Sequence, residues 1–115
     1  MSAITVGEGP TEMGVNNLEN RLYVVNRDSD SVSVIGGTDD GNYRNIANVT
    51  VGDSPEDVFV DEFFGETHVP SWIDNNITAI FATDEDYDTY NYSAHQPSKI
   101  ALSGNITYVA GNSED

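Results

Sequence analysis

The chain has 115 residues, the length of one ordinary domain, and contains no cysteine, so it has neither disulfides nor thiolate metal sites. Its 20 acidic residues against 4 basic ones give a formal net charge of -16. This charge argues against nucleic acid and anionic membranes as partners, because binding to either rests on cationic side chains. No apolar run of about 18 residues is present to span a membrane.

The first half of the chain predicts short strands separated by turns. Residues 4–6 are all β-branched and predict the end of a strand, which stops at Gly7. Four further strands are predicted at residues 12–15, 21–26, 31–35 and 44–51. No segment has apolar residues at helical spacing, so the sequence predicts an all-β fold.

The second half predicts the same kind of element. Strands are expected at residues 56–61, 67–71, 76–80, 90–93, 98–102 and 105–110. The strand at 67–71 is the least regular, because Pro70 lacks a backbone donor and is expected at a sheet edge or a bulge. Trp72, Phe63, Phe64 and Tyr90 are predicted to pack between neighbouring units rather than to stack on a sugar.

A repeated motif sets the register of these strands. The sequence Thr-Val-Gly-Glu-Gly-Pro at residues 5–10 recurs 45 residues later as Thr-Val-Gly-Asp-Ser-Pro. A period of about 40–50 residues is typical of repeat architectures, and four short strands per period indicate a β-propeller blade. We therefore expect an incomplete propeller. Residues 1–9 would form the outer strand of a preceding blade and a connection. Blade 1 would span residues 10–54, blade 2 residues 55–96, and the first half of blade 3 residues 97–115.

Residues 21–35, Arg-Leu-Tyr-Val-Val-Asn-Arg-Asp-Ser-Asp-Ser-Val-Ser-Val-Ile, carry a family resemblance. Together with the preceding Val-Gly-x-x-Pro motif, they resemble the YVTN β-propeller repeat, named after a Tyr-Val-Thr-Asn tetrapeptide. The tetrapeptide stands here as Tyr-Val-Val-Asn at residues 23–26 and as Tyr-Val-Ala-Gly at residues 108–111. The resemblance implies a secreted or surface-layer protein, often archaeal, that serves in adhesion or as a scaffold.

Oxygen-rich side chains suggest two further kinds of site. Four Asn-x-Ser/Thr sequons could carry glycans in an exported protein: Asn48, Asn76, Asn91 and Asn105. A weak calcium candidate is the acidic stretch containing Asp84, Glu85, Asp86 and Asp88, although it lacks the glycine-centred spacing of an EF-hand loop. The turn at residues 26–31 is a weaker candidate, because short polar side chains commonly cap such turns.

No catalytic set can be assembled from the sequence. His68 and His95 are the only imidazoles, too few for a three-ligand zinc site, and no Ser-His-Asp triad can be selected. We therefore expect a non-catalytic module without a cofactor, apart from the calcium candidate, and the resemblance implies that it is extracellular or at the cell surface. Its expected partners are the remaining blades of the same chain or copies of itself, and a protein or glycan ligand. The alternative is part of a propeller enzyme, lactonase-like or a cofactor-dependent oxidoreductase, whose catalytic residues lie in other blades.

Overall fold

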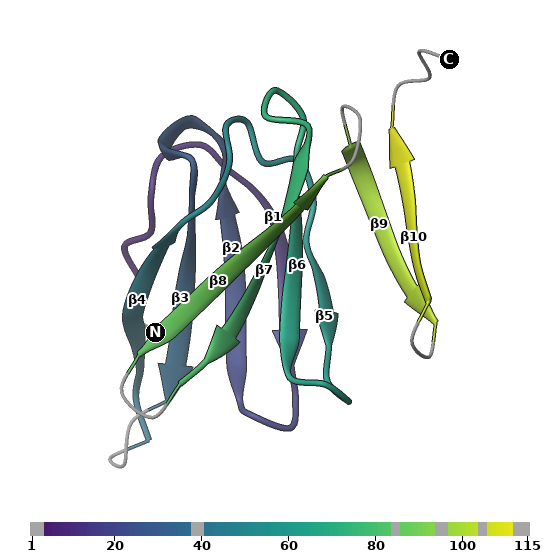
Figure 1. Cartoon of the computed structure of the whole chain (residues 1–115). Coiled ribbons are helices and arrows are strands. Elements are labelled where there is room, and N and C mark those ends of the chain that lie inside the picture. Colours follow the sequence, from purple (N-terminus) through teal and green to yellow (C-terminus); the bar gives the residue numbers. More distant parts are fainter. Residues whose placement is uncertain (1–3, 38–40, 84–85, 94–96, 104–105, 112–115) are drawn as a thin grey trace.

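The structure is a computed structural model that describes residues 4–37, 41–83, 86–93 and, as backbone only, 97–103 and 106–111. It consists of β-strands with one short 3-10 turn, Arg27–Ser29 (Figure 1). The strands are β1 (Pro10–Asn16), β2 (Arg21–Asn26), β3 (Ser31–Gly37), β4 (Tyr43–Thr50), β5 (Phe59–Asp61), β6 (Glu66–Ser71), β7 (Asn76–Ala82), β8 (Tyr87–Ser93), β9 (Pro97–Ser103) and β10 (Ile106–Gly111). None of the described residues forms a helix that could cross a membrane.

The strands form two antiparallel four-stranded sheets and one hairpin. The first sheet has the order β1-β2-β3-β4, the second has the order β5-β6-β7-β8, and β9 pairs with β10. The sheets lie face to face, with β1 beside β5, while β9 lies against β5 and β6 (Figure 1). The predicted fold class, all-β with antiparallel four-stranded blades of an incomplete propeller, is confirmed.

The 45-residue sequence repeat is also a repeat of backbone conformation. We call residues 45 apart equivalent. Three equivalent pairs occupy the left-handed region: Gly9 and Ser54, Asn20 and Gly65, Asp30 and Asn75. A turn hydrogen bond is repeated as well, because Arg27 N donates to the Gly9 carbonyl at 2.9 Å and Trp72 N donates to the Ser54 carbonyl at 3.2 Å. The two sheets are therefore copies of one blade.

The glycine of the Thr-Val-Gly motif is required by a close approach to the blade that follows it. A Cβ on Gly7 would lie 2.7 Å from Asn26 Nδ2, and a Cβ on Gly52 would lie 2.6 Å from Ser71 Cβ. Asn26 and Ser71 are equivalent and completely buried. The motif therefore marks the place where the incoming chain crosses the end of the second strand of each blade.

The core lies between the two sheets. The front face of the first sheet, defined by Tyr23, Val25, Val32 and Val34, packs against the back face of the second. That back face consists of Val58, Val60, Thr67, Val69, Ile80 and Tyr87; five of these form part of the core packing, while Thr67 bonds to Tyr23. The Tyr23 and Tyr87 rings meet edge to face at 6.4 Å, and Arg21 Nε donates to the Tyr87 hydroxyl at 3.2 Å. The apolar side chains of the central strands thus bury one face of each sheet against the other.

Three predicted strands differ most from the observed ones. Residues 4–6 are described but belong to no strand, and the carbonyl of Thr5 accepts a hydrogen bond from Asn45 Nδ2 on β4. Strand β5 begins at Phe59 rather than at residue 56. Strand β8 begins at Tyr87 rather than at residue 90, so the predicted acidic loop is shorter. The assignment of residues 1–9 to a preceding blade stays a prediction.

Pro70 explains why β5 is short. It lies within β6, a central strand, and not at the predicted edge or bulge. Its carbonyl accepts from Glu56 N at 3.0 Å, on the side of β6 where β5 would continue. A residue's N–H and C=O point to the same side of a strand, so the donor missing at Pro70 faces this segment. Regular pairing there begins only at Phe59.

Candidate functional site

Two equivalent turns lie at the same end of the stacked sheets, the lower end in Figure 1: residues 17–20 between β1 and β2, and residues 62–65 between β5 and β6. Side-chain caps hold both turns. Asn16 Oδ1 accepts from Glu19 N at 3.0 Å, and Asp61 Oδ1 accepts from Phe64 N at 3.2 Å. These caps occupy equivalent positions and fix the turns in one conformation.

The tips of these turns carry large apolar side chains in solvent. Leu18 is 76% exposed, its equivalent Phe63 is 86% exposed, and Phe64 is 56% exposed. The Phe63 and Phe64 rings meet edge to face with centroids 4.8 Å apart. We call these three residues the apolar rim. The prediction that Phe63 and Phe64 pack between blades is wrong, and their exposure on rigid turns is typical of a binding surface.

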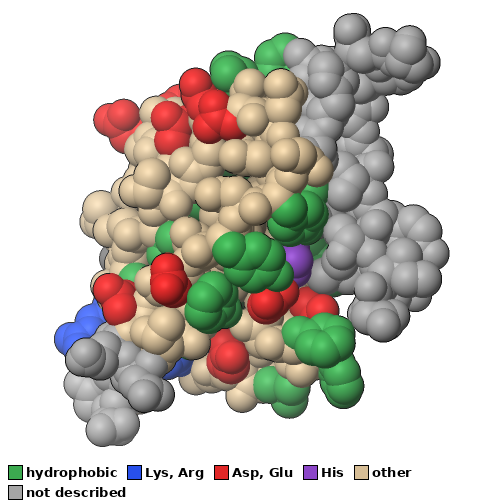
Figure 2. All heavy atoms as spheres, viewed as in Figure 1, with side chains coloured by type: hydrophobic (Ala, Val, Ile, Leu, Met, Phe, Trp, Pro, Cys, Tyr) green, Lys and Arg blue, Asp and Glu red, His purple; other side chains and the backbone are tan. Residues whose placement is uncertain are grey.

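Carboxylates flank the apolar rim. Glu62 Oε2 accepts from Asn17 Nδ2 of the neighbouring turn at 3.4 Å, which links the two blades at this end. Glu19 Oε2 lies 3.5 Å from the position of a Cβ on Gly65, so Glu19 reaches the second turn. Figure 2 shows hydrophobic side chains with acidic ones beside them on this face of the molecule. The surface therefore combines apolar contact with negative charge.

A second group of interacting side chains lies on the front face of the second sheet. His68 is 5% exposed; its Nδ1 lies 2.8 Å from the Tyr92 hydroxyl, and its Nε2 lies 3.3 Å from Glu66 Oε1. The Tyr90 hydroxyl donates to the same Glu66 oxygen at 2.9 Å. Residues of β6 and β8, which flank β7, are thereby joined across one sheet.

Burial decides the protonation of this group. Desolvation lowers the pKa of His68 and outweighs the opposing effect of the nearby Glu66 carboxylate. Burial and the hydrogen bond to Glu66 raise the pKa of the Tyr90 hydroxyl. The group therefore holds a neutral imidazole between a hydroxyl and a carboxylate. We interpret it as a structural cross-link of the sheet.

The calcium candidate is only partly described. Asp84 and Glu85 lie outside the described residues. Asp86 is exposed, and its backbone N–H and carbonyl bond to the Thr83 hydroxyl. Asp88 lies in strand β8 rather than in a loop, and its Oδ1 accepts from Thr89 N at 2.8 Å. Within the described ranges no three acidic or imidazole side chains are grouped to hold a metal ion, and the calcium site stays a prediction.

The sequon asparagines have a structural role. Asn48 and Asn91 are exposed on the outer strands β4 and β8. Asn48 Oδ1 accepts from Ser33 Oγ at 2.8 Å, and Asn91 Oδ1 accepts from Thr78 Oγ1 at 2.7 Å. Asn76 is half-buried at the start of β7, and Asn105 lies outside the described residues. Their use as glycan acceptors stays a prediction.

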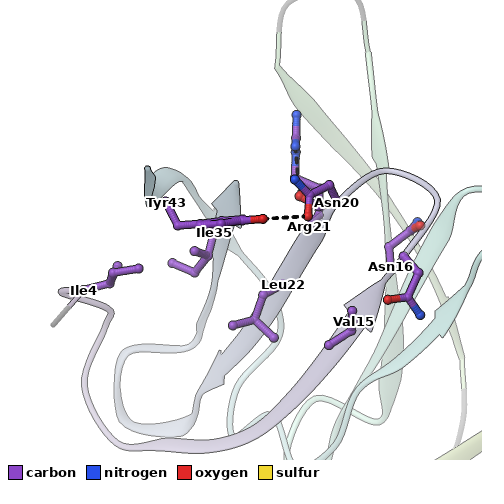
Figure 3. A pocket seen from close by; sticks show the side chains of 9 residues that line it. Ile4, Val15, Asn16, Asn20, Arg21, Leu22, Ile35 and Tyr43 are labelled. Carbon is purple, nitrogen blue, oxygen red and sulfur yellow. Dashed lines mark hydrogen bonds between the residues drawn. The ribbon is translucent and has the colours of Figure 1, made fainter. Parts of the chain in front are cut away.

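A hollow that the sequence did not predict lies on the back face of the first sheet, opposite the interblade core (Figure 3). Its volume is about 290 Å³. Its lining is apolar at Ile4, Val15, Leu22 and Ile35 and polar at Asn16, Asn17, Asn20, Arg21 and Tyr43. The Tyr43 hydroxyl donates to Asn20 Oδ1 at 3.2 Å along one wall.

Comparison with known proteins supports the fold. No family model matches the chain, and no curated protein matches it in sequence. The structure is similar to Kuenenia stuttgartiensis hydrazine synthase, a β-propeller-containing protein, with a TM-score of 0.74 and 18% identity over 96% of this chain and 31% of that one. It is also similar to a functionally unknown protein from Desulfotomaculum acetoxidans DSM 771, with a TM-score of 0.63 and 13% identity over 79% of this chain and 29% of that one. The chain thus spans less than a third of either structure, and at this identity the likeness concerns the fold alone.

Proposed function

We propose that the chain is a non-catalytic binding or scaffold segment of a YVTN-type β-propeller, whose stacked blades present the apolar rim to a protein or glycan ligand. The observation that carries this proposal is the repetition of the rim. Leu18 and Phe63 are equivalent, both are exposed, and both stand on capped turns at one end of the blades. Exposed apolar side chains at rigid, repeated positions favour a surface built for contact.

Binding measurements on a triple variant test the rim. Leu18→Ser, Phe63→Ser and Phe64→Ser together remove the apolar side chains without touching the caps at Asn16 and Asp61. The probes are chitopentaose, cellopentaose and an alternating Lys-Leu peptide, which offer sugar faces or a cationic apolar chain. We expect saturable binding of at least one probe, weakened about tenfold or more in the triple variant.

The matched control is Ile73→Ser. Ile73 is 51% exposed in the turn between β6 and β7, at the other end of the blade. The substitution removes one exposed apolar side chain outside the rim and leaves the rim intact, so binding should be unchanged. Binding that is equal in the triple variant and in the original chain, or absent for every probe, would contradict the proposal.

The proposal includes an extracellular or cell-surface location. It is supported by the exposure of Asn48 and Asn91 on the outer strands, where a glycan would meet little of the protein. We expect the intact mass of the natively produced protein to exceed the sequence mass by a glycan on at least one sequon. A native mass equal to that of the bare sequence would argue against modification.

A catalytic role is the alternative. It is favoured by one observation, the similarity of the fold to a synthase. In that case this segment would support a central channel whose catalytic residues belong to other blades. Hydrolysis of a lactone by the isolated chain would contradict the non-catalytic proposal.

A further inference from the structure

The front face of the second sheet differs in chemistry from the front face of the first. On the first sheet, Ala47 and Val49 of the outer strand β4 pack against the interblade core. On the second sheet, the same register positions of the outer strand β8 are held by Tyr90 and Tyr92. Tyr90 is 44% exposed. Two small apolar side chains are thus replaced by two large aromatic ones, and part of this aromatic surface meets solvent.

Three aromatic rings lie side by side on this face, and we call Phe81, Tyr90 and Tyr92 the aromatic platform. The centroid of the Tyr90 ring is 6.2 Å from that of Phe81 and 6.3 Å from that of Tyr92. The Tyr90 hydroxyl donates to Glu66, which lies on β6 beyond the intervening strand β7. The Tyr90 side chain therefore lies across β7, where the small Ala79 stands opposite it. This anchoring holds the central ring of the platform in one orientation.

The polar atoms around the platform bond to one another. The Tyr90 hydroxyl donates to Glu66 Oε1 at 2.9 Å, and His68 Nε2 lies 3.3 Å from the same oxygen. The Tyr92 hydroxyl lies 2.8 Å from His68 Nδ1. These groups are therefore less available to a ligand rich in hydroxyls, such as a sugar, which needs hydrogen-bonding partners beside an aromatic ring. What the platform offers a ligand is mainly the faces of its rings.

The charge on this face is negative. Phe81 stands in the sheet between two carboxylates, because it pairs with Glu66 on one side and with Asp88 on the other. The imidazole of His68 adds no positive charge, since burial lowers its pKa. Residues 59–93, which form the second sheet and its turns, contain no Lys or Arg. Figure 2 shows hydrophobic side chains next to the imidazole, with acidic side chains around them. Aromatic rings among carboxylates attract a cation.

We propose that the aromatic platform binds a small quaternary ammonium compound, whose positive charge lies over the Tyr90 ring and near the Glu66 carboxylate. A quaternary ammonium group carries a charge but has no N–H donor, so it suits ring faces whose neighbouring polar atoms are already engaged. The bond from Tyr90 to Glu66 orients the ring before the ligand arrives, which reduces the entropy cost of binding. The site uses no residue of the apolar rim, and it goes beyond the role proposed for the rim.

Nuclear magnetic resonance titration of the full chain with choline tests the proposal. We expect saturable shifts of the Tyr90 ring protons at millimolar concentrations, since a few cation–π contacts give a weak affinity. Neohexanol has the shape of choline with carbon in place of the charged nitrogen, and it should bind at least about tenfold more weakly. Acetyl-lysine amide, a primary ammonium, should bind at least about fivefold more weakly. No saturable shift with choline, or equal binding of choline and either other probe, would overturn the proposal.

Variants followed through their backbone amide shifts, which also report folding, test the ring. Tyr90→Leu removes the ring and should weaken choline binding at least about fivefold, whereas Tyr90→Phe keeps it and should stay within about threefold. The matched control is Tyr43→Leu, because Tyr43 is 53% exposed on the outer strand of the first sheet. It should bind choline like the original chain. Equal affinity of the two Leu variants for choline would overturn the proposal.

Glu66→Gln tests the carboxylate. Gln keeps the size of the side chain and an acceptor for the Tyr90 hydroxyl but removes the charge. Choline binding should weaken at least about threefold, while neohexanol binding should not change. Unchanged choline binding in folded Glu66→Gln would overturn the assignment of the charge to this site.

Discussion

At the scale of single residues, the glycine of the Thr-Val-Gly motif links the sequence repeat to the packing. A Cβ on Gly52 would lie 2.6 Å from Ser71 Cβ and 2.9 Å from Asn76 Oδ1. Ser71 is completely buried, so it has little room to move away. The motif therefore needs glycine because of this close approach. Backbone conformation is not the reason, since the φ of Gly52 is not in the left-handed region.

Gly52→Ala should destabilise the chain by about 1–3 kcal/mol, because overpacking forces buried atoms apart. The measurement is chemical unfolding followed by circular dichroism. Ser71→Gly removes the two atoms that the new Cβ would meet first, Ser71 Cβ and Oγ, and it serves as the matched background. The cost of Gly52→Ala should be smaller in that background, and an equal cost in both would show that the clash is not its cause.

His68 gives the fold a dependence on pH. Burial lowers its pKa below the usual value in the folded chain, so between the folded and the unfolded pKa the unfolded state binds more protons. Stability is therefore lost as the pH falls through the unfolded pKa of about 6.5. Stability should therefore be lower at pH 5.5 than at pH 7.5, with an upper bound of about 1.4 kcal/mol per pH unit below the unfolded pKa.

The measurement is the unfolding midpoint of the original chain and of His68→Gln at these two pH values. Gln keeps a polar side chain but does not titrate, so its midpoint should change less over this range. His95 is present in both chains and serves as an internal control. A decrease of the same size in both chains would show that His68 is not responsible.

At the scale of the elements, the sequence predicted the strands well where the repeat was regular. The predicted strands 21–26 and 31–35 correspond to β2 and to most of β3. The errors fall where tertiary contacts override local pattern. Pro70 lies in a central strand and the neighbouring strand β5 is shortened beside it, and no local rule predicts this adjustment of a neighbour.

The candidate site was less predictable. The sequence predicted that Phe63 and Phe64 pack between blades, since large aromatic side chains usually bury their surface. Whether a turn lies against a neighbouring blade depends on how the blades stack, and this information is not local. The hollow on the back face was missed for the same reason, because its lining comes from five separate segments of the chain.

The interblade core should account for much of the stability of these elements. Ile80 is completely buried between the sheets, and Ile80→Ala should cost about 2–5 kcal/mol through lost burial and the cavity left behind. Ile73→Ala makes the same chemical change at a side chain that is 51% exposed, and it should cost less than about 0.5 kcal/mol. Equal costs in a denaturant titration would contradict the assigned interface.

At the scale of the whole molecule, charge opposes compactness. A net charge of -16 on 115 residues produces self-repulsion, which salt screens over a Debye length of about 10 Å at 0.1 M. The thermal midpoint should therefore rise between about 0.02 M and 1 M potassium chloride, because screening weakens this repulsion. Uncharged sucrose of equal osmolality is the control. A midpoint that does not depend on salt would contradict this account.

The central claim is that the two sheets are copies of one blade stacked face to face. Nuclear Overhauser effects in a labelled sample test it most directly, because they report contacts between side chains in solution. The account predicts effects between the ring protons of Tyr23 and Tyr87, whose centroids are 6.4 Å apart, and between Gly14 and the methyl groups of Val60. Cross-strand effects within each sheet without any effect between the sheets would contradict it.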